Sequence, residues 1–438
     1  MKSFNKLYCA LAFGHGALAT IVPGTLKTVT TATDDNNQAA WWSPLDEAGG
    51  YSWLGYTRNP TSGSKANNNV MIARVDISTG EIIRDCVRAS SSADCSLFAD
   101  DLGHNQPSVG VDGDGFVHVF TSMHNNVWRY FKSGDPYSST TFADASGDMP
   151  DGSVLITYPV VKRDAAGDLW LIVRGEAPGD TSGRGGYFYH YATKSKTWTR
   201  VARFAYRTGF AVYPDDIQFS SDGDVHLQWE WSKYPSSAGR HEGSYLRYRP
   251  STGKFRTITG QEVTLPVTQS TANLVFQPLT SGEIYQNINT DPPLLQSAKM
   301  AIYEDSAGGV HVQHAYRFQN ETSGPWQIRR ARSTGDASAP WAREIVQPSP
   351  DTTAAIGITH DGTTVRIYYC RKSGSAWVLE KTGSAAWSNN ELAAVKGKRV
   401  ERLQALMRND GTDVLYLAAP TNVDSTTGSV YLLDVGGR

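Results

Sequence analysis

Residues 103–133 read GHNQPSVGVDGDGFVHVFTSMHNNVWRYFKS and contain the motif that decides the fold. Apolar and polar residues alternate over 108–112 and 116–122, on either side of an Asp-Gly turn at 113–115. This pattern predicts a β-hairpin. The combination of a turn and an alternating strand returns along the chain about every 50 residues. The aspartates that begin these turns are Asp112, Asp164, Asp222, Asp305, Asp361 and Asp410.

A repeat of about 50 residues with about four strands is typical of a β-propeller blade. Strand patterns at 51–58 and 69–76 add one blade without the Asp-Gly motif. We therefore predict an all-β fold, a seven-bladed β-propeller from about residue 38 to 436, forming one catalytic domain at 20–438. The long interval between Asp222 and Asp305 predicts an insertion at 260–289 on the fourth blade.

The composition limits the classes of partner. The chain has 438 residues, 39% of them hydrophobic, and a net charge of −2. It therefore lacks the excess of positive charge that nucleic acids and membrane surfaces attract, and we expect neither as a partner. The 21 tyrosines and 12 tryptophans suit strands and an aromatic binding surface. We expect a monomer.

The N-terminus and the cysteines indicate secretion. Residues 1–19 combine two lysines, a short apolar run and a small-residue cleavage site at 17–19, as signal peptides do. We therefore expect an extracellular protein. Cys86 and Cys95 flank a polar loop and are predicted to form a disulfide, whereas Cys370 is predicted to be a buried thiol. Asn320 begins a glycosylation sequon.

The repeat also predicts which residues share a face. If every Asp-Gly turn joins the first and second strands of its blade, all these turns lie on one face of the ring. Residues that enter first strands or leave second strands then lie on the opposite face, together with the starts of third strands and the ends of fourth strands. This set comprises His104, Asn105, Gln106, His124, Asn125, Tyr158, Tyr213, Asp215, Asp216, Arg174, Lys233, Tyr234, His314, Arg317, Arg371, Tyr187, Tyr245, Arg329, Arg203 and Arg207.

Two histidines stand out within that set. His104 and His124 lie at the two outer ends of the first hairpin, so they are predicted to lie side by side. Asn105 and Asn125 follow them directly. Two neighbouring imidazoles can exchange protons near neutral pH, which makes this pair a candidate catalytic site.

A face rich in arginine, tyrosine and histidine suits an acidic sugar. Arginine binds a uronate carboxylate through two hydrogen bonds, and aromatic rings pack on sugar rings. The same residue types serve β-elimination, in which the carboxylate is neutralised, a proton leaves C5 and the oxygen on C4 is protonated. A glycoside hydrolase would need two facing carboxylates. Asp215 and Asp216 are adjacent in a predicted strand and should point to opposite sides.

The segment 103–133, with its two histidines, DGDG turn and MHNN-x-WRYF tail, resembles the signature of BNR-4 type seven-bladed β-propeller polysaccharide lyases, which include the ulvan lyases. The chain is most similar to the fungal secreted L-rhamnose-α-1,4-D-glucuronate lyases that act on gum arabic. The resemblance implies that His104 and His124 are catalytic. It also implies a tyrosine, an arginine and a second tyrosine on later blades, for which Tyr187, Arg203 and Tyr245 are the best matches. Arg207 or Arg240 remain alternatives to Arg203, and Tyr189 to Tyr187.

These residues together define the predicted site. The expected catalytic residues are His104, His124, Tyr187 and Arg203. The expected substrate-binding residues are Asn105, Asn125, Arg174, Tyr245, Arg240 and Arg317. The resemblance implies no cofactor for the chemistry, and it allows a structural calcium ion held by carbonyl oxygens at the ring axis.

The expected function is β-elimination on an acidic polysaccharide. The enzyme would release L-rhamnose from rhamnosyl-α-1,4-glucuronate ends and leave a 4,5-unsaturated glucuronate. An endo-acting ulvan lyase and a propeller lectin that binds acidic glycans without cleaving them remain alternatives.

Overall fold

The computed structural model describes residues 24–33, 41–59, 67–88, 94–99, 106–235, 240–268, 295–319, 325–348, 351–421 and 427–436. For residues 99, 240–242 and 295–297 only the backbone is described. The predicted signal peptide, His104, Asn105, Asn320 and residues 269–289 of the predicted insertion lie outside these ranges.

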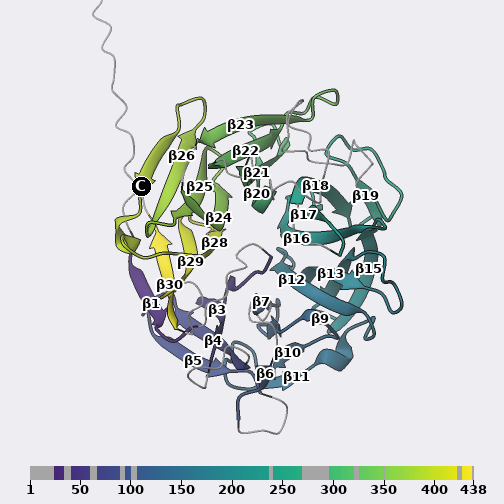
Figure 1. Ribbon diagram of the computed structural model, residues 1–438, viewed down its shortest axis with the longest axis vertical. Helices are drawn as coiled ribbons and strands as arrows, with labels where there is room; N and C mark the ends of the chain where they lie inside the picture. The colour runs from purple at the N-terminus through teal and green to yellow at the C-terminus, as the bar shows by residue number, and fades with distance from the viewer. Residues whose placement is uncertain are drawn as a thin grey trace, which may run out of the picture.

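Seven antiparallel sheets stand side by side around an axis, which confirms the predicted seven-bladed propeller (Figure 1). Blade 1 contains β2 (Leu45–Ala48), β3 (Tyr51–Arg58), β4 (Asn67–Asp76), β5 (Ile82–Cys86) and β6 (Leu97–Ala99). Blade 2 contains β7 (Ser108–Val111), β8 (Val117–Phe120), β10 (Tyr130–Ser133) and β11 (Phe142–Asp144). Blade 3 contains β9 (His124–Asn126), β12 (Leu155–Arg163), β13 (Leu169–Glu176), β14 (Gly185–Ala192) and β15 (Thr197–Ala205). Blades 4 and 5 contain β16 (Phe210–Phe219), β17 (Val225–Lys233), β18 (Arg240–Arg249) and β19 (Lys254–Arg256); and β20 (Leu295–Glu304), β21 (Val310–Gln319), β22 (Trp326–Ser333) and β23 (Trp341–Gln347). Blades 6 and 7 contain β24 (Thr352–His360), β25 (Thr364–Arg371), β26 (Ser375–Thr382) and β27 (Ser388–Glu391); and β28 (Arg402–Met407), β29 (Asp413–Pro420), β30 (Gly428–Val435) and β1 (Leu26–Thr30).

Helix is nearly absent from the described chain. Two 3-10 helices, Ser146–Asp148 and Ala393–Val395, are the helical elements found there. No helix in those ranges has the length and apolar character needed to cross a membrane.

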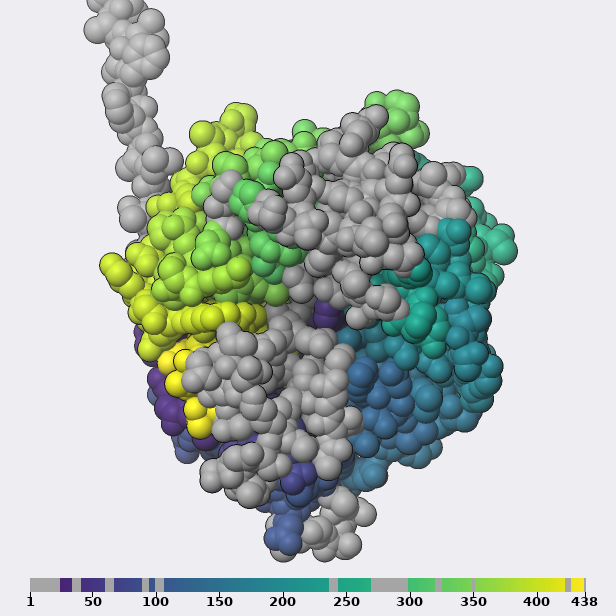
Figure 2. Space-filling model, in the orientation of Figure 1, coloured from purple at the N-terminus to yellow at the C-terminus, as the bar shows by residue number. Residues whose placement is uncertain are grey.

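The ring is closed by the first strand of the chain. β1 pairs with β30 in antiparallel register, with Leu26 opposite Leu433 and Lys27 opposite Leu432. The N-terminal strand, purple in Figure 1, therefore forms the outer edge of the last, yellow blade. In the space-filling view the colours of the blades follow one another around the ring (Figure 2). This strand was not predicted, because the alternation of apolar and polar residues over only five positions is too weak to indicate a strand.

The Asp-Gly motif is a recurring turn between the two innermost strands of a blade. Oδ1 of Asp112 accepts hydrogen bonds from the N–H groups of Asp114 (3.0 Å) and Phe116 (2.8 Å). The carboxylates of Asp164, Asp305 and Asp361 accept two backbone N–H groups in the same way. Each turn also needs a residue with positive φ, and glycine supplies it without steric cost, as at Gly115 (φ 89°).

The second carboxylate oxygen of this aspartate holds the strand that follows. Oδ2 accepts from a side chain on the second strand in four blades, at distances of 2.7 to 3.1 Å. The partners are His118, Trp170, His311 and Arg366. One carboxylate therefore closes the turn and also fixes the position of the next strand relative to it.

The core lies between adjacent blades, and the described residues leave a small cavity at the axis. Tryptophans such as Trp170 and Trp229 are buried between blades 3 and 4. At the axis, strands of five blades and the segment Trp42–Ser43 enclose a cavity of about 10 Å³, room for roughly one water molecule. Nζ of Lys299 donates to the carbonyl oxygen of Asp215 there (2.6 Å), and Nζ of Lys162 lies 3.7 Å from Oδ1 of Asp216.

The cysteines are arranged as predicted. Cys86 and Cys95 form a disulfide with a Cα–Cα distance of 5.6 Å. Cys370 is a fully buried thiol in β25, and burial raises its pKa.

Replacement of Asp112 by alanine tests the recurring turn. In the variant, two turn N–H groups and the buried His118 lose their acceptor. We expect the free energy of unfolding in urea to fall by about 3 kcal/mol. Asp410→Ala is the matched control, because the Asp410 carboxylate is exposed and bonds only Thr412. We expect a loss of less than about 1 kcal/mol there. Equal losses in the two variants would contradict the role of the second oxygen.

The turn of blade 6 predicts a dependence of stability on pH. Burial raises the pKa of Asp361, but the N–H groups of Thr364 and Thr363 and the Arg366 guanidinium outweigh burial and bring this pKa to about 2. A lowered pKa stabilises the fold above the ordinary value of 3.8 and ceases to do so as the pH falls toward 2. We expect Asp361→Asn to flatten the loss of stability between these pH values. Asp351→Asn, at an exposed carboxylate, should follow the unsubstituted protein.

Candidate active site

The short strand β9 brings His124 and Asn125 to the inner edge of blade 3. β9 pairs with β12, with His124 opposite Thr157. The backbone N–H of Asn125 donates to Oγ1 of Thr157 (2.9 Å), and that hydroxyl donates to Oδ1 of Asn125 (3.1 Å). The chain therefore leaves blade 2 after β8 and adds a strand to the next blade. His104 and Asn105 lie outside the described residues, so the predicted pairing of the two histidines stays a prediction.

Arg174 lies beside this strand in the interior of the protein. It is in β13, opposite Thr157, and only 2% of it is exposed. Nη2 lies 3.4 Å from Oδ1 of Asn125. Nε is buried without a hydrogen-bond partner, and among the described residues no carboxylate forms an ion pair with this arginine. A buried cation without a partner is costly, so such a group is expected where an anion binds.

Two tyrosines cover the guanidinium group of Arg174. Its Cζ atom lies 4.4 Å from the ring centroid of Tyr158 and 5.1 Å from that of Tyr213. The two rings are 5.2 Å apart, and Trp41 lies 5.0 Å from each. Trp42 lies edge-on to Tyr158 at 5.2 Å. These contacts place an arginine against aromatic rings, beside the amide of Asn125.

Tyr158 and Tyr213 occupy equivalent positions in neighbouring blades. Each precedes a proline, in β12 and β16, and the pairing register shifts between Thr157 and Val160 and between Pro214 and Asp216. Proline cannot donate to the ladder, so the strand bulges there and the tyrosine side chain is redirected. Tyr158 has a φ of 57°, a strained conformation for tyrosine that is typical of functional sites.

Both tyrosines belong to the face that the repeat predicts for the site, but neither is among the residues expected to be catalytic or to bind substrate. The Tyr-Pro dipeptide occurs at 158–159, 213–214 and 234–235, and its first two occurrences, both at the fourth residue of a strand about 55 residues apart, are the signal that could have identified them. We use the name arginine–aromatic cluster for Arg174, Tyr158, Tyr213, Trp41 and Trp42.

Tyr187 and Arg203, the predicted catalytic pair, belong to a different group. They lie on β14 and β15, and the guanidinium of Arg203 is 5.6 Å from the Tyr187 ring centroid. Arg203 is neutralised by Asp180 (3.2 Å) and covers the Tyr206 ring at 3.5 Å. Tyr187 is 3% exposed within an apolar core, and burial raises its pKa. The alternative Tyr189 is also buried and donates to Oδ2 of Asp151 (3.2 Å).

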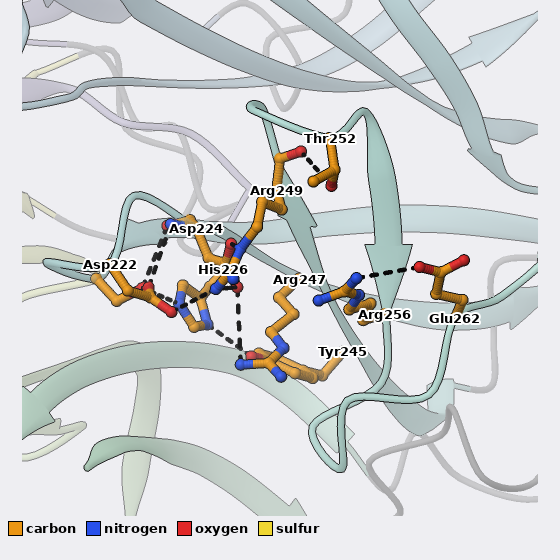
Figure 3. Close-up of polar contacts among 10 residues, drawn as sticks. Asp222, Asp224, His226, Tyr245, Arg247, Arg249, Thr252, Arg256 and Glu262 are labelled. Atoms are coloured by element: carbon orange, nitrogen blue, oxygen red, sulfur yellow. Dashed lines mark hydrogen bonds and ion pairs between the residues drawn. The ribbon is translucent and has the colours of Figure 1, made fainter. Parts of the chain in front are cut away.

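Tyr245 lies in the interior of the protein, outside the arginine–aromatic cluster, and its predicted place among the substrate-binding residues stays a prediction. It is 1% exposed between blades 4 and 5. Its hydroxyl bonds Nδ1 of His226 (2.6 Å), and Nε2 of His226 bonds Ser220 (2.8 Å) (Figure 3). Burial lowers the pKa of His226 to about 3, so this imidazole is neutral. The network supports the turn that begins at Asp222.

Arg317 is not part of the arginine–aromatic cluster. Arg317 is 6% exposed and donates to Oγ1 (3.1 Å) and the carbonyl oxygen (3.0 Å) of Thr352, which ties blade 5 to blade 6. Its predicted contact with substrate is therefore not supported by its position. The backbone of Arg240 begins β18, and its side chain lies outside the description.

The calcium ion expected at the axis, held by carbonyl oxygens, stays a prediction. Within the described ranges, no group of three or more His, Cys, Asp or Glu side chains could hold a metal ion. At the axis, the ammonium groups of Lys299 and Lys162 line the cavity. The first donates to the carbonyl oxygen of Asp215, and the second lies beside the carboxylate of Asp216. A calcium ion at that level would be repelled by both, so the expectation stays a prediction for other parts of the axis.

Comparisons with known proteins agree with the fold. The ulvan lyase of Pseudoalteromonas sp. (strain PLSV) is 20% identical over 267 residues, 53% of this chain and 50% of that enzyme. The chain thus matches half the length of that relative. The ulvan lyase of Alteromonas sp. (strain LOR) is 20% identical over 76% of this chain and 72% of the enzyme.

Solved structures show the same architecture. An ulvan lyase structure of family PL25 superposes with a TM-score of 0.67 at 16% identity, covering 92% of this chain and 94% of that one. The polysaccharide lyase Uly1 superposes with a TM-score of 0.68 at 13% identity, covering 95% and 100%. The profile of BNR repeat-containing family members matches residues 39–336. This match spans well over half of the sequence, and the chain belongs to the BNR repeat-containing family.

Proposed function

We propose that this protein is a polysaccharide lyase that cleaves an acidic glycan by β-elimination at a glucuronate. The observation that carries the proposal is Arg174, a buried guanidinium with no carboxylate partner among the described residues, placed between two tyrosines and Asn125. A uronate carboxylate would supply the missing negative charge. The ulvan lyases to which the chain is similar support the same reaction class.

The chain's own groups can carry each part of the elimination. Arg174 and Asn125 bind the carboxylate and stabilise the negative charge that develops when the proton leaves C5. His124, Tyr158 and Tyr213 supply the base that takes this proton and the acid that protonates O4. The C4–O4 bond breaks, a C4–C5 double bond forms, and the leaving sugar departs with a hydroxyl group. In this assignment Tyr158, Tyr213 and Arg174 take the places expected for Tyr187, Tyr245 and Arg203.

For the substrate we propose L-rhamnosyl-α-1,4-D-glucuronate ends of gum arabic. A related ulvan lyase has been solved with a glucuronate–sulfated rhamnose oligosaccharide, so the pairing of glucuronate with rhamnose recurs in a relative. The ulvan lyase alternative fits the same observation. We also propose secretion, because disulfides such as Cys86–Cys95 are characteristic of oxidising compartments.

Paired substitutions test the assignment of the site. We expect Tyr213→Phe and Arg174→Lys to lower the rate of formation of the ultraviolet-absorbing unsaturated uronate by a factor of about 10² or more. Tyr187→Phe and Arg203→Lys make the same chemical changes in the neighbouring group and should retain activity within about threefold. If the second pair loses activity and the first retains it, the site lies around Tyr187. Thermal unfolding verifies that all four variants fold.

Incubation with two polysaccharides tests the substrate. We expect gum arabic to yield free rhamnose and unsaturated glucuronate ends, measured by sugar analysis and ultraviolet absorbance. Product from ulvan alone would replace the proposed specificity by that of an ulvan lyase. Retention of both polysaccharides without any product would contradict the lyase assignment and indicate a lectin.

A further inference from the structure

A cleft between blades 5 and 6 lies on the face of the Asp-Gly turns. Its volume is about 530 Å³, within the range of about 300–1,000 Å³ that ligand sites occupy. One wall contains Tyr303, two residues before Asp305 at a turn. The other includes Gly383, which follows β26 where Thr382 pairs with Thr364, beside the turn of Asp361. The cleft thus opens on the face opposite to His124 and Arg174.

The side chains of this cleft are predominantly cationic. Arg330, Arg332, Arg343 and Lys381 line it with one carboxylate, Glu344. Glu344 lies 2.8 Å from Nη1 of Arg330 and 3.8 Å from Nζ of Lys381. Arg332 is exposed and has no carboxylate partner among the described residues. Four cations against one carboxylate give the cleft an excess of positive charge.

The base of the cleft is rigid. Arg330 is 7% exposed, and its Nε donates to Oε1 of Gln313 (2.6 Å). Nε1 of Trp387 donates to Oε2 of Glu344 (3.3 Å), and Lys381 lies 5.7 Å from the Trp387 ring. A guanidinium held in this way loses little freedom when it binds a planar anion, which favours binding.

An aromatic wall accompanies these charges. The Tyr303 ring stacks between His360 (3.8 Å between centroids) and His311 (4.9 Å), which fixes its orientation. Because imidazoles cover the faces of this ring, Tyr303 forms a fixed wall of the cleft, and the binding of an acidic sugar there depends on the guanidinium groups beside it.

We propose that this cleft is a second, non-catalytic binding site for an acidic polysaccharide, in which Arg332 and Arg343 bind the carboxylate or sulfate groups of the sugar. The site would hold the polymer while the opposite face acts on chain ends. Two attachments on one protein raise the local concentration of substrate. The inference needs no turnover, so it can hold or fail independently of the proposed lyase activity.

The test is native electrophoresis in gels that contain polyglucuronate. His124→Ala is the parent chain, so that a lyase would not consume the polymer during the run. We compare this parent with chains that also carry R332Q and R343Q, or K194Q and K254Q. Lys194 and Lys254 are exposed and lie on the same face of the ring as the cleft, in blades 3 and 4. Their substitution removes two positive charges, as the substitution of Arg332 and Arg343 does. Gels with dextran sulfate distinguish sulfate from carboxylate as the bound group, and neutral dextran is the blank.

We expect the cleft substitutions to weaken retention by polyglucuronate or dextran sulfate about tenfold, and the lysine substitutions to leave it close to that of the parent. Equal retention of the two substituted chains, or no retention of the parent by either polymer, would overturn the proposal. A second measurement uses the parent itself: phenylglyoxal modification of Arg332 and Arg343, followed by mass spectrometry, should be slowed by the retaining polymer and unchanged by dextran. Unslowed modification would also overturn the proposal.

Discussion

The hydrogen bonds made by one aspartate carboxylate at the inner turn of six blades determine the geometry of the propeller. One oxygen closes the turn through backbone N–H groups, and in four blades the other oxygen holds a side chain of the second strand. The register of the two inner strands is therefore fixed at the turn end of the blade, opposite to the end that holds Arg174. A slip of one residue would turn Arg174 and its neighbours toward the opposite side of the sheet.

The candidate site lies where this regular pairing is interrupted. Tyr158 and Tyr213 each lie beside a proline at a shift in register, and β9 crosses from blade 2 to pair with blade 3. The contrast between two buried arginines shows what this interruption does. Arg366 lies within 3.4 Å of the carboxylates of Asp361, Glu380 and Asp413. Arg174 instead faces two rings and an amide, so it keeps an unneutralised charge for a ligand.

The sequence was sufficient to predict the architecture, because the Asp-Gly turn repeats with its own chemistry in six of the seven blades. It also predicted the disulfide and the face that holds Arg174 and Asn125. It was insufficient to separate residues that face the site from residues that face the next blade. Tyr245 illustrates this, because its position along the repeat allowed its side chain to face either the site or the next blade. In the structure the side chain is buried against His226. Strand β9 was not predicted either, because a three-residue strand that pairs with the next blade leaves no alternation of apolar and polar residues in the sequence.

The small size of the axial cavity limits where a glycan can bind. Trp42 lines the axial cavity and also contacts Tyr158, so the arginine–aromatic cluster rests on the packed centre of the ring. A cavity of about 10 Å³ cannot admit a sugar. A glycan therefore does not enter the ring at the level of this cavity, and Arg174 is held beside it by two tyrosines. Because those rings are themselves held by Trp41 and Trp42, the guanidinium is preorganised for a carboxylate that approaches from the side of β9.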